Sequence, residues 1–182
     1  KGDGTGTISY IYDATGVKLK KTAPGNMVTE YTGNYVYKKV NNTTTLEFIN
    51  HAEGYVENEN NAYKYVYQYK DHLGNIRVSY DNSGSVSSPN ASIVEENNYY
   101  PFGLQHKGYN NVVSSNANSV ASKFKYQGVE HEEALGLNLY EMDWRNYDPA
   151  LGRFTSIDPV THHSQSTYTA FDNNPIFWAD PS

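Results

Sequence analysis

β-forming and polar residues alternate along the first half of the chain. Residues 8–12 are β-formers, residues 13–16 read Asp-Ala-Thr-Gly, and apolar residues alternate with lysines over residues 17–20. This order predicts a strand, a tight turn and a returning strand. Every second residue from Tyr63 to Tyr69 is a tyrosine, so these rings share one face of a predicted strand. The same reasoning predicts one continuous antiparallel sheet with strands near residues 7–12, 17–21, 34–40, 63–70, 75–80 and 137–146.

Turn-forming and polar segments separate these units. The Ser/Asn-rich stretches 81–92 and 107–122 are predicted to be exposed loops. Between them, Pro101 and Gly103 predict a turn with Tyr99, Tyr100 and Phe102 packed under it. One short helix or helical turn is expected over residues 161–171, where polar residues precede Tyr168, Ala170 and Phe171. It should end before Pro175, because the residue before a proline avoids the α region. We expect three parts, at residues 1–106, 107–122 and 123–182.

Composition indicates an all-β protein. The chain has 182 residues, 18 of them Tyr and 14 Gly, a combination of strand-formers and turn residues. Its net charge is -6 and its basic residues are scattered, which argues against nucleic acid as a partner. No apolar run approaches the roughly 20 residues of a membrane span. With no Cys and dispersed His, neither a metal site nor a cofactor is expected.

Two groups of side chains suggest chemistry and also have a structural interpretation. The tyrosines could form an aromatic platform for sugars or peptides, but cross-strand pairing with solvent-facing hydroxyls is the favoured interpretation. The carboxylates include Glu95, Glu96, Glu130, Glu132, Glu133, Glu141 and Asp143. A pair of them could serve glycoside hydrolysis. Runs of Glu beside loops are more often a solvated face, which is what we expect here.

Arginines and Asp-Pro pairs form the remaining candidates. Arg145 and Arg153 flank residues 148–152, whose Asp-Pro-Ala-Leu-Gly sequence predicts a β-turn, with the arginines paired to nearby acids. Asp158-Pro159 and Asp180-Pro181 follow, 22 positions apart. Two carboxylates held close together cannot both ionise, so one can act as an acid while the other activates water.

The final third of the chain resembles one known family. The stretches "KYQGVEHEEALGLNLYEMDWRNYDPALGRFTSIDP" (residues 125–159) and "YTAFDNNPIFWADPS" (residues 168–182) are similar to the repeat-associated core of the Rhs/YD-repeat proteins. The string "YIYDATGVKLKK" (residues 10–21) resembles one YD repeat, and residues 62–105 resemble the family more loosely. The resemblance implies a YD-repeat sheet that forms part of a hollow β-shell, with the core domain closing one end.

The resemblance also implies a role for the Asp-Pro pairs. In this family two such motifs at this spacing form an intramolecular aspartyl protease, so Asp158 and Asp180 are the candidate catalytic pair, with Arg153 as an electrostatic partner. The first motif continues Val160-Thr161 and lacks the family's glycine. The alternative, that both pairs only form turns, is about as well supported.

The expected function is encapsulation and delivery of a C-terminal effector, with single-turnover self-cleavage rather than turnover of an external substrate. The expected partners are the remainder of the parent chain, the secretion or delivery machinery, and a toxin with its carrier. The alternative is a secreted or cell-surface adhesin built on YD repeats without a toxin. Either way we expect a secreted or cell-surface location. We also expect the parent to extend N-terminally and the isolated piece to be poorly soluble, because of open edges at its first strand and along the tyrosine strands.

Overall fold

The computed structural model describes residues 5–59, 62–85, 87–108, 110, 117–160 and 163–180. These residues form a nine-stranded and a four-stranded antiparallel sheet. The large sheet contains β1 (Ser9–Tyr12), β2 (Lys18–Ala23), β3 (Met27–Thr32), β4 (Tyr35–Val40), β5 (Thr43–His51), β6 (Gly54–Glu59), β7 (Ala62–Lys70), β8 (Ile76–Asn82) and β9 (Ala91–Glu96). The small sheet contains β10 (His131–Glu132), β11 (Leu139–Glu141), β12 (Asn146–Asp148) and β13 (Arg153–Phe154).

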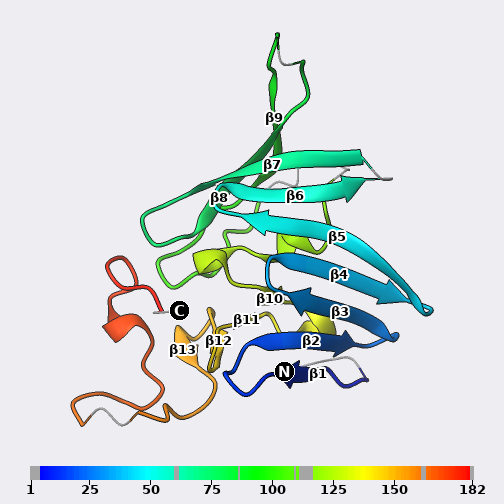
Figure 1. The fold of residues 1–182 in the computed structure, drawn as a ribbon. Coiled ribbons are helices and arrows are strands. Elements are labelled where there is room, and N and C mark those ends of the chain that lie inside the picture. The colour runs from blue at the N-terminus through cyan, green and yellow to red at the C-terminus, as the bar shows by residue number, and fades with distance from the viewer. Residues whose placement is uncertain are drawn as a thin grey trace.

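Strand order follows chain order in both sheets. The large sheet rises as a ladder from β1 to β9, and the small sheet lies beside its N-terminal strands (Figure 1). No described residue is in an α-helix, and the described helical elements are 3-10 turns of three residues each. The all-β prediction is therefore confirmed. The division at residues 106, 107–122 and 123 stays a prediction.

The predicted hairpin between β1 and β2 is present and is stabilised locally. Asp13 Oδ1 accepts hydrogen bonds from the backbone N–H groups of Thr15 (2.8 Å) and Val17 (3.0 Å), as Asp does in turns. Gly16 takes φ +91°, which a residue with a β-carbon rarely adopts. The predicted strands near 7–12, 17–21, 34–40, 63–70 and 75–80 correspond to β1, β2, β4, β7 and β8.

The predicted strand at 137–146 is wrong, and so is its place in a single continuous sheet. The chain reverses within this stretch, so that β11 pairs with β12 through Tyr140↔Tyr147 and Glu141↔Asn146 in a separate sheet. The reversal takes place at Met142–Arg145, where Asp143 and Trp144 are exposed. Alternation alone did not reveal the break because Tyr140, Met142 and Tyr147 are all buried on its two sides.

The predicted helix at 161–171 is also wrong over its described residues. Thr161 and His162 lie outside the described residues. The chain after them lies along β13, where Phe154 N donates to Tyr168 O (3.1 Å) and Arg153 forms a bridge with Thr169. A 3-10 turn follows at Phe171–Asn173. The predicted loop 81–92 is shorter than expected, because β8 runs to Asn82 and β9 starts at Ala91.

Two hydrophobic clusters hold the sheets in place. One lies on the inner face of the large sheet and contains Val36, Phe48, Tyr55, Val66, Val94, Val120 and Ala121. The other forms the centre of the small sheet and contains Tyr99, Tyr126, Tyr140, Met142, Tyr147, Phe154, Ala170 and Phe171. Tyr99 and Phe102 pack beneath the turn at Pro101–Gly103 as expected, whereas Tyr100 is half exposed and stacks against His106.

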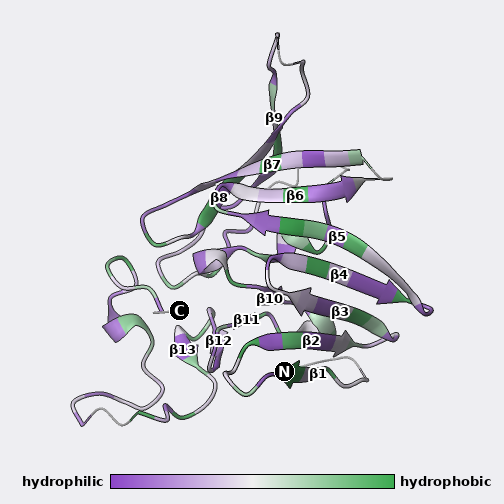
Figure 2. Cartoon of the chain, viewed as in Figure 1, coloured by the Kyte–Doolittle hydropathy of each residue, from purple (hydrophilic) through white to green (hydrophobic). Residues whose placement is uncertain are grey.

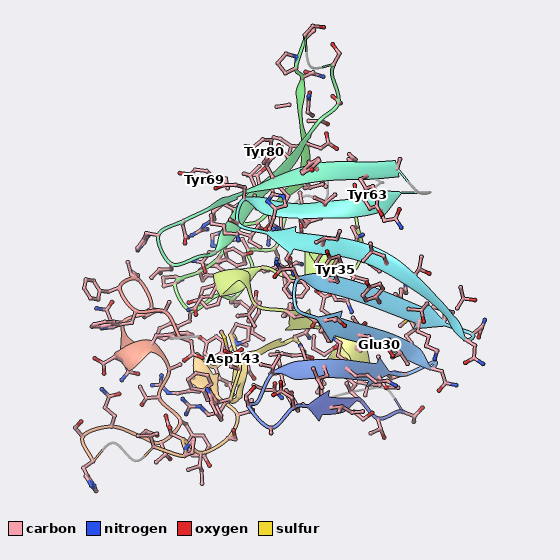
Figure 3. The ribbon with its side chains drawn as sticks, in the orientation of Figure 1. Glu30, Tyr35, Tyr63, Tyr69, Tyr80 and Asp143 are labelled. Atoms are coloured by element: carbon pink, nitrogen blue, oxygen red, sulfur yellow. The ribbon has the colours of Figure 1, made fainter. Side chains whose placement is uncertain are left out.

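The opposite face of the large sheet presents aromatic rings to solvent. Tyr63, Tyr65 and Tyr69 are 62, 58 and 67 % exposed, while Val66 between them is fully buried. Hydrophobic residues are interspersed with hydrophilic ones along the strands (Figure 2), and Tyr63, Tyr69 and Tyr80 are marked in Figure 3. β7 pairs with both β6 and β8, so the tyrosine strand is not the open edge that we expected; β1, at the end of the sheet, is one.

Candidate functional site

Asp158 lies after β13, where backbone and side-chain bonds fix its position. Its N–H donates to Thr167 O (2.9 Å), and its Oδ1 accepts from the N–H of Val160 (2.8 Å). Its Oδ2 lies 2.9 Å from Arg145 Nη2. Arg145 is held in turn by stacking on Phe154, with the guanidinium carbon 3.6 Å from the ring centroid. The carboxylate of Asp158 is therefore aimed at a fixed, largely buried cation.

Asp180 reaches the same region from the C-terminal segment. Its N–H donates to Gln127 Oε1 (2.9 Å), and the N–H of Gln127 donates to Asn75 Oδ1 (2.9 Å). Burial raises the pKa of Asp180, and the negative charges of Asp143 and Asp158 raise it further, while Arg145 opposes them. The charges of Asp158 and Arg145 therefore both act on the Asp180 carboxyl, and the acid pair itself stays a prediction.

Arg153 does not take part in this environment. Its Nη1 donates to Gly152 O (3.0 Å), within the turn that joins β12 to β13. That turn is as predicted, with Asp148 Oδ1 accepting from the N–H groups of Ala150 and Leu151. The arginine beside the acids is Arg145, which the sequence singled out only as a salt-bridge partner.

A cleft of about 340 Å³ opens at Asp158. Its lining includes the hydroxyl-bearing Ser166, Thr167 and Thr169, together with the partly exposed Trp178. One candidate acid therefore faces open space that a peptide group could enter. No three or more of the described His, Cys, Asp and Glu residues are grouped so as to hold a metal ion.

A second cluster of charges lies between the two sheets. Lys21 on β2 contacts Glu130 in a short ion pair, Glu132 at 2.8 Å and Glu141 at 3.5 Å. Lys18 forms ion pairs with Glu130 (2.9 Å) and Glu141. Lys21 and Glu130 are each 2 % exposed, and Glu132 is 1 % exposed. The expectation that Glu130 and Glu132 form a solvated face is therefore wrong.

Two tyrosines complete this ion cluster of Lys18, Lys21, Glu130, Glu132 and Glu141. The hydroxyl of Tyr31 donates to Glu130 Oε2 and that of Tyr10 to Glu141 Oε1, both at 2.7 Å. Burial would raise the pKa of Glu130, but the two lysines outweigh it and lower that pKa to about 2. The three carboxylates are thus bound by cations, which suits a structural clamp and not the acid and base of a glycosidase.

A β-bulge explains why both lysines face inward. Tyr12 pairs with Lys18 and Ile11 with Lys20, so Leu19 is an extra residue on β2. Without it, Lys18 and Lys21 would point to opposite faces because their separation is odd. The sequence offered one signal for the acidic partners: Glu130 and Glu132 are two residues apart, so on a strand their side chains point to the same face.

Comparison with known proteins gives the following likenesses. No family model matches the chain. Over its whole length it is 27 % identical to the tRNA3(Ser)-specific nuclease WapA of Bacillus spizizenii and 26 % identical to the tRNA nuclease WapA of Bacillus subtilis, covering 8 % of each. Over 59 % of its length it is 30 % identical to salivary gland surface protein 1 of Aedes aegypti, covering 3 % of that protein.

Solved structures share the fold. The crystal structures of TcdB2-TccC3-TEV and TcdB2-TccC3 match all of this chain with TM-scores of 0.73 and 0.72, at 23 % identity, over 9 % of their own chains. The chain thus spans less than a tenth of the length of these relatives. The likenesses support the resemblance to the Rhs/YD-repeat family, although not the repeat-associated core in particular. No helix among the described residues is long and apolar enough to cross a membrane.

Proposed function

We propose that this chain supplies the terminal strands and the end plug of a YD-repeat shell that encloses and delivers a C-terminal effector. The observation that carries the proposal is that a long sheet and a small sheet of different construction are joined in one structure. A ribbon of nine strands in chain order has a small sheet fixed to its inner face by the buried ion cluster. A ribbon of this kind can continue by adding strands at β1, while the small sheet covers the inner face and cannot continue it.

The proposed shell releases its effector by a single self-cleavage, which Asp158 and Asp180 catalyse as an acid pair. Asp158 is ion-paired with Arg145, so it is the candidate base that activates water. Asp180 has a raised pKa, so it is the candidate acid that protonates the leaving amine. Of the two aspartates, Arg145 forms its ion pair with Asp158, which would keep Asp158 ionised as the base while Asp180 carries the proton. Thr161, which stands where the family has glycine, lies outside the described residues.

Cleavage is tested in the natural protein that carries this chain, analysed on a denaturing gel. The wild type should appear as two pieces, whereas Asp158→Asn and Asp180→Asn should each give one, because asparagine keeps the size and turn-forming tendency but not the acid. Asp172→Asn is the matched control, since Asp172 also lines the cleft at Asp158 yet accepts a hydrogen bond from Gln165 instead of pairing with Arg145. An intact wild type, or cleavage that survives both substitutions, would show that the aspartates are structural.

A second candidate function rests on the exposed tyrosines. A cell-surface adhesin would use the outer face of β7, where Tyr63, Tyr65 and Tyr69 are more than half exposed. Replacing the three with serine should then abolish adhesion of cells that display the protein and leave self-cleavage unchanged. Under the shell proposal the same variant delivers its effector normally. A secreted or cell-surface location, and the delivery machinery as a partner, belong to both proposals.

A further inference from the structure

A second, larger cleft lies where the turns of the large sheet meet the small sheet. It measures about 430 Å³, within the range of roughly 300–1,000 Å³ that is typical of ligand sites. The β1–β2 turn forms one wall, and the turn between β11 and β12 forms the other. Asp143, on the second wall, is marked in Figure 3 between the small sheet and β2. We call this space the sheet–core cleft.

The sheet–core cleft has an apolar floor and an aromatic rim. Val36 and Met142, both buried, and the partly buried Phe124 form its floor. Tyr12 and Trp144 stand at its rim, 49 and 74 % exposed. Trp144 lies over the β1–β2 turn, since a β-carbon at Gly16 would be 3.8 Å from its ring. An exposed Trp beside an apolar pocket is the arrangement found at binding hot spots.

The charge at the mouth of this cleft is negative. Glu141 is ion-paired with Lys18 and accepts a hydrogen bond from the hydroxyl of Tyr10. Asp143, by contrast, pairs with no basic side chain in the part of the chain that the structure describes. A ligand with a basic group next to an apolar group would therefore complement this mouth.

The sheet–core cleft also adjoins the candidate acid pair. Asp143 lines the cleft and is close enough to Asp180 for its charge to act on that carboxyl. Arg145, which pairs with Asp158, follows two residues later on the same turn. Asp143 and Arg145 are two residues apart, so their α-carbons are at most about 7 Å apart. A chain bound at Asp143 would therefore lie near the arginine that pairs with Asp158.

We propose that the sheet–core cleft binds an extended segment of polypeptide, with an aliphatic or aromatic side chain on the Val36–Phe124 floor and a basic side chain at Asp143. The inference rests on the proposed function, because the segment of chain that the acid pair cleaves must be held extended beside it. It makes Tyr12 and Trp144 specificity-determining residues that bind the chain without taking part in bond cleavage.

The test uses the natural protein and a synthetic peptide, N-acetyl-Gly-Lys-Leu-Phe-Gly-amide, in which the leucine carries a photoreactive diazirine. After illumination, peptide mapping should locate the crosslinks at the floor residues Val36, Phe124 and Met142 and in the adjoining walls, residues 12–17 and 141–144. The same peptide with Glu in place of Lys should crosslink at least tenfold less, because its charge opposes Asp143. Trp144→Ala should reduce crosslinking about tenfold, as loss of a hot-spot Trp does. Tyr63→Ala, a matched loss of an exposed aromatic on the other face, should leave it unchanged.

Equal labelling by the two peptides, or crosslinks spread over the tyrosine face, would overturn the proposal. Asp158→Asn keeps this result separate from the proposed function: it should abolish cleavage and leave the crosslinks in place. If Asp158→Asn still cleaves while crosslinking persists, the protease proposal fails and the binding cleft stands. If cleavage requires Asp158 but the crosslinks do not map to the cleft, the binding proposal fails and the protease proposal stands.

Discussion

Replacing Lys21 with methionine should release the small sheet from the large one. Lys21 is buried and meets three carboxylates, those of Glu130, Glu132 and Glu141. Without it, Lys18 alone would face the three acids. Removing one partner of a buried ion pair typically costs about 3–5 kcal/mol, because a charge is left buried without compensation.

The pKa of Glu130 gives a second measure of the same contact. The shift from the usual 4.5 to about 2 corresponds to about 3 kcal/mol, at about 1.4 kcal/mol per pKa unit. Because the folded-state pKa is the lower one, this stabilisation is fully present above about pH 4.5 and is lost as the pH falls towards 2. The deficit of Lys21→Met should therefore be full at pH 7 and shrink below about pH 4.5.

Amide hydrogen exchange in the natural protein measures this directly, after correction for the intrinsic exchange rate at each pH. The amides of β10 and β11 should lose about 100-fold or more of their protection at pH 7. Lys20→Met is the matched control, because Lys20 lies on the opposite face of β2 and forms no ion pair among the described residues. Equal protection in the two variants, or a deficit that stays constant down to pH 3, would refute the reasoning.

Two further predictions follow from other contacts. Gly103→Ala should lower the free energy of unfolding, measured in urea, by about 2–4 kcal/mol, because the added β-carbon would lie 2.7 Å from the Tyr126 ring. Gly25 has a similar φ but no atom within 4 Å of the position of an added β-carbon, so Gly25→Ala should lower the free energy of unfolding by only about 1 kcal/mol. Equal decreases in the two variants would disprove the packing argument. The rate of self-cleavage should fall as the pH rises through the raised pKa of Asp180. Asp143→Asn should move this fall in rate to lower pH, because one of the charges that raise the pKa of Asp180 is gone. A pH–rate profile that does not move would exclude Asp180 as the acid.

Local chemistry made part of the ribbon predictable: β1, β2, β4, β7 and β8 were expected, whereas β3, β5, β6 and β9 were not. Each hairpin carries its own turn signal, such as Asp13 and Gly16, and strand pairing needs no information from distant residues. The reversal at Met142–Arg145 was not predictable, because it depends on Tyr140 and Tyr147 packing together in a core whose residues come from six separate stretches of the chain. The placement of Tyr168 and Thr169 against β13 likewise depends on contacts that their own sequence does not specify.

The candidate site could be predicted in part. The resemblance to the Rhs/YD-repeat family singled out Asp158 and Asp180, and their role as an acid pair stays a prediction. In the structure Asp158 pairs with Arg145, whose charge opposes the raised pKa of Asp180. The choice of Arg145 over Arg153 could not be made, because it depends on the ring of Phe154, on which only Arg145 stacks. The ion cluster was missed because a single extra residue, Leu19, decides which lysines point inward.

The strand order of the ribbon has a consequence for how the chain acquires its structure. Each strand from β1 to β9 pairs only with its neighbours in sequence, so every hairpin can close as soon as its second strand is available. The contacts between Lys21 and Glu130 join residues 109 positions apart and must form later. A chain that emerges N-terminus first would thus build the large sheet progressively and attach the small sheet only at the end.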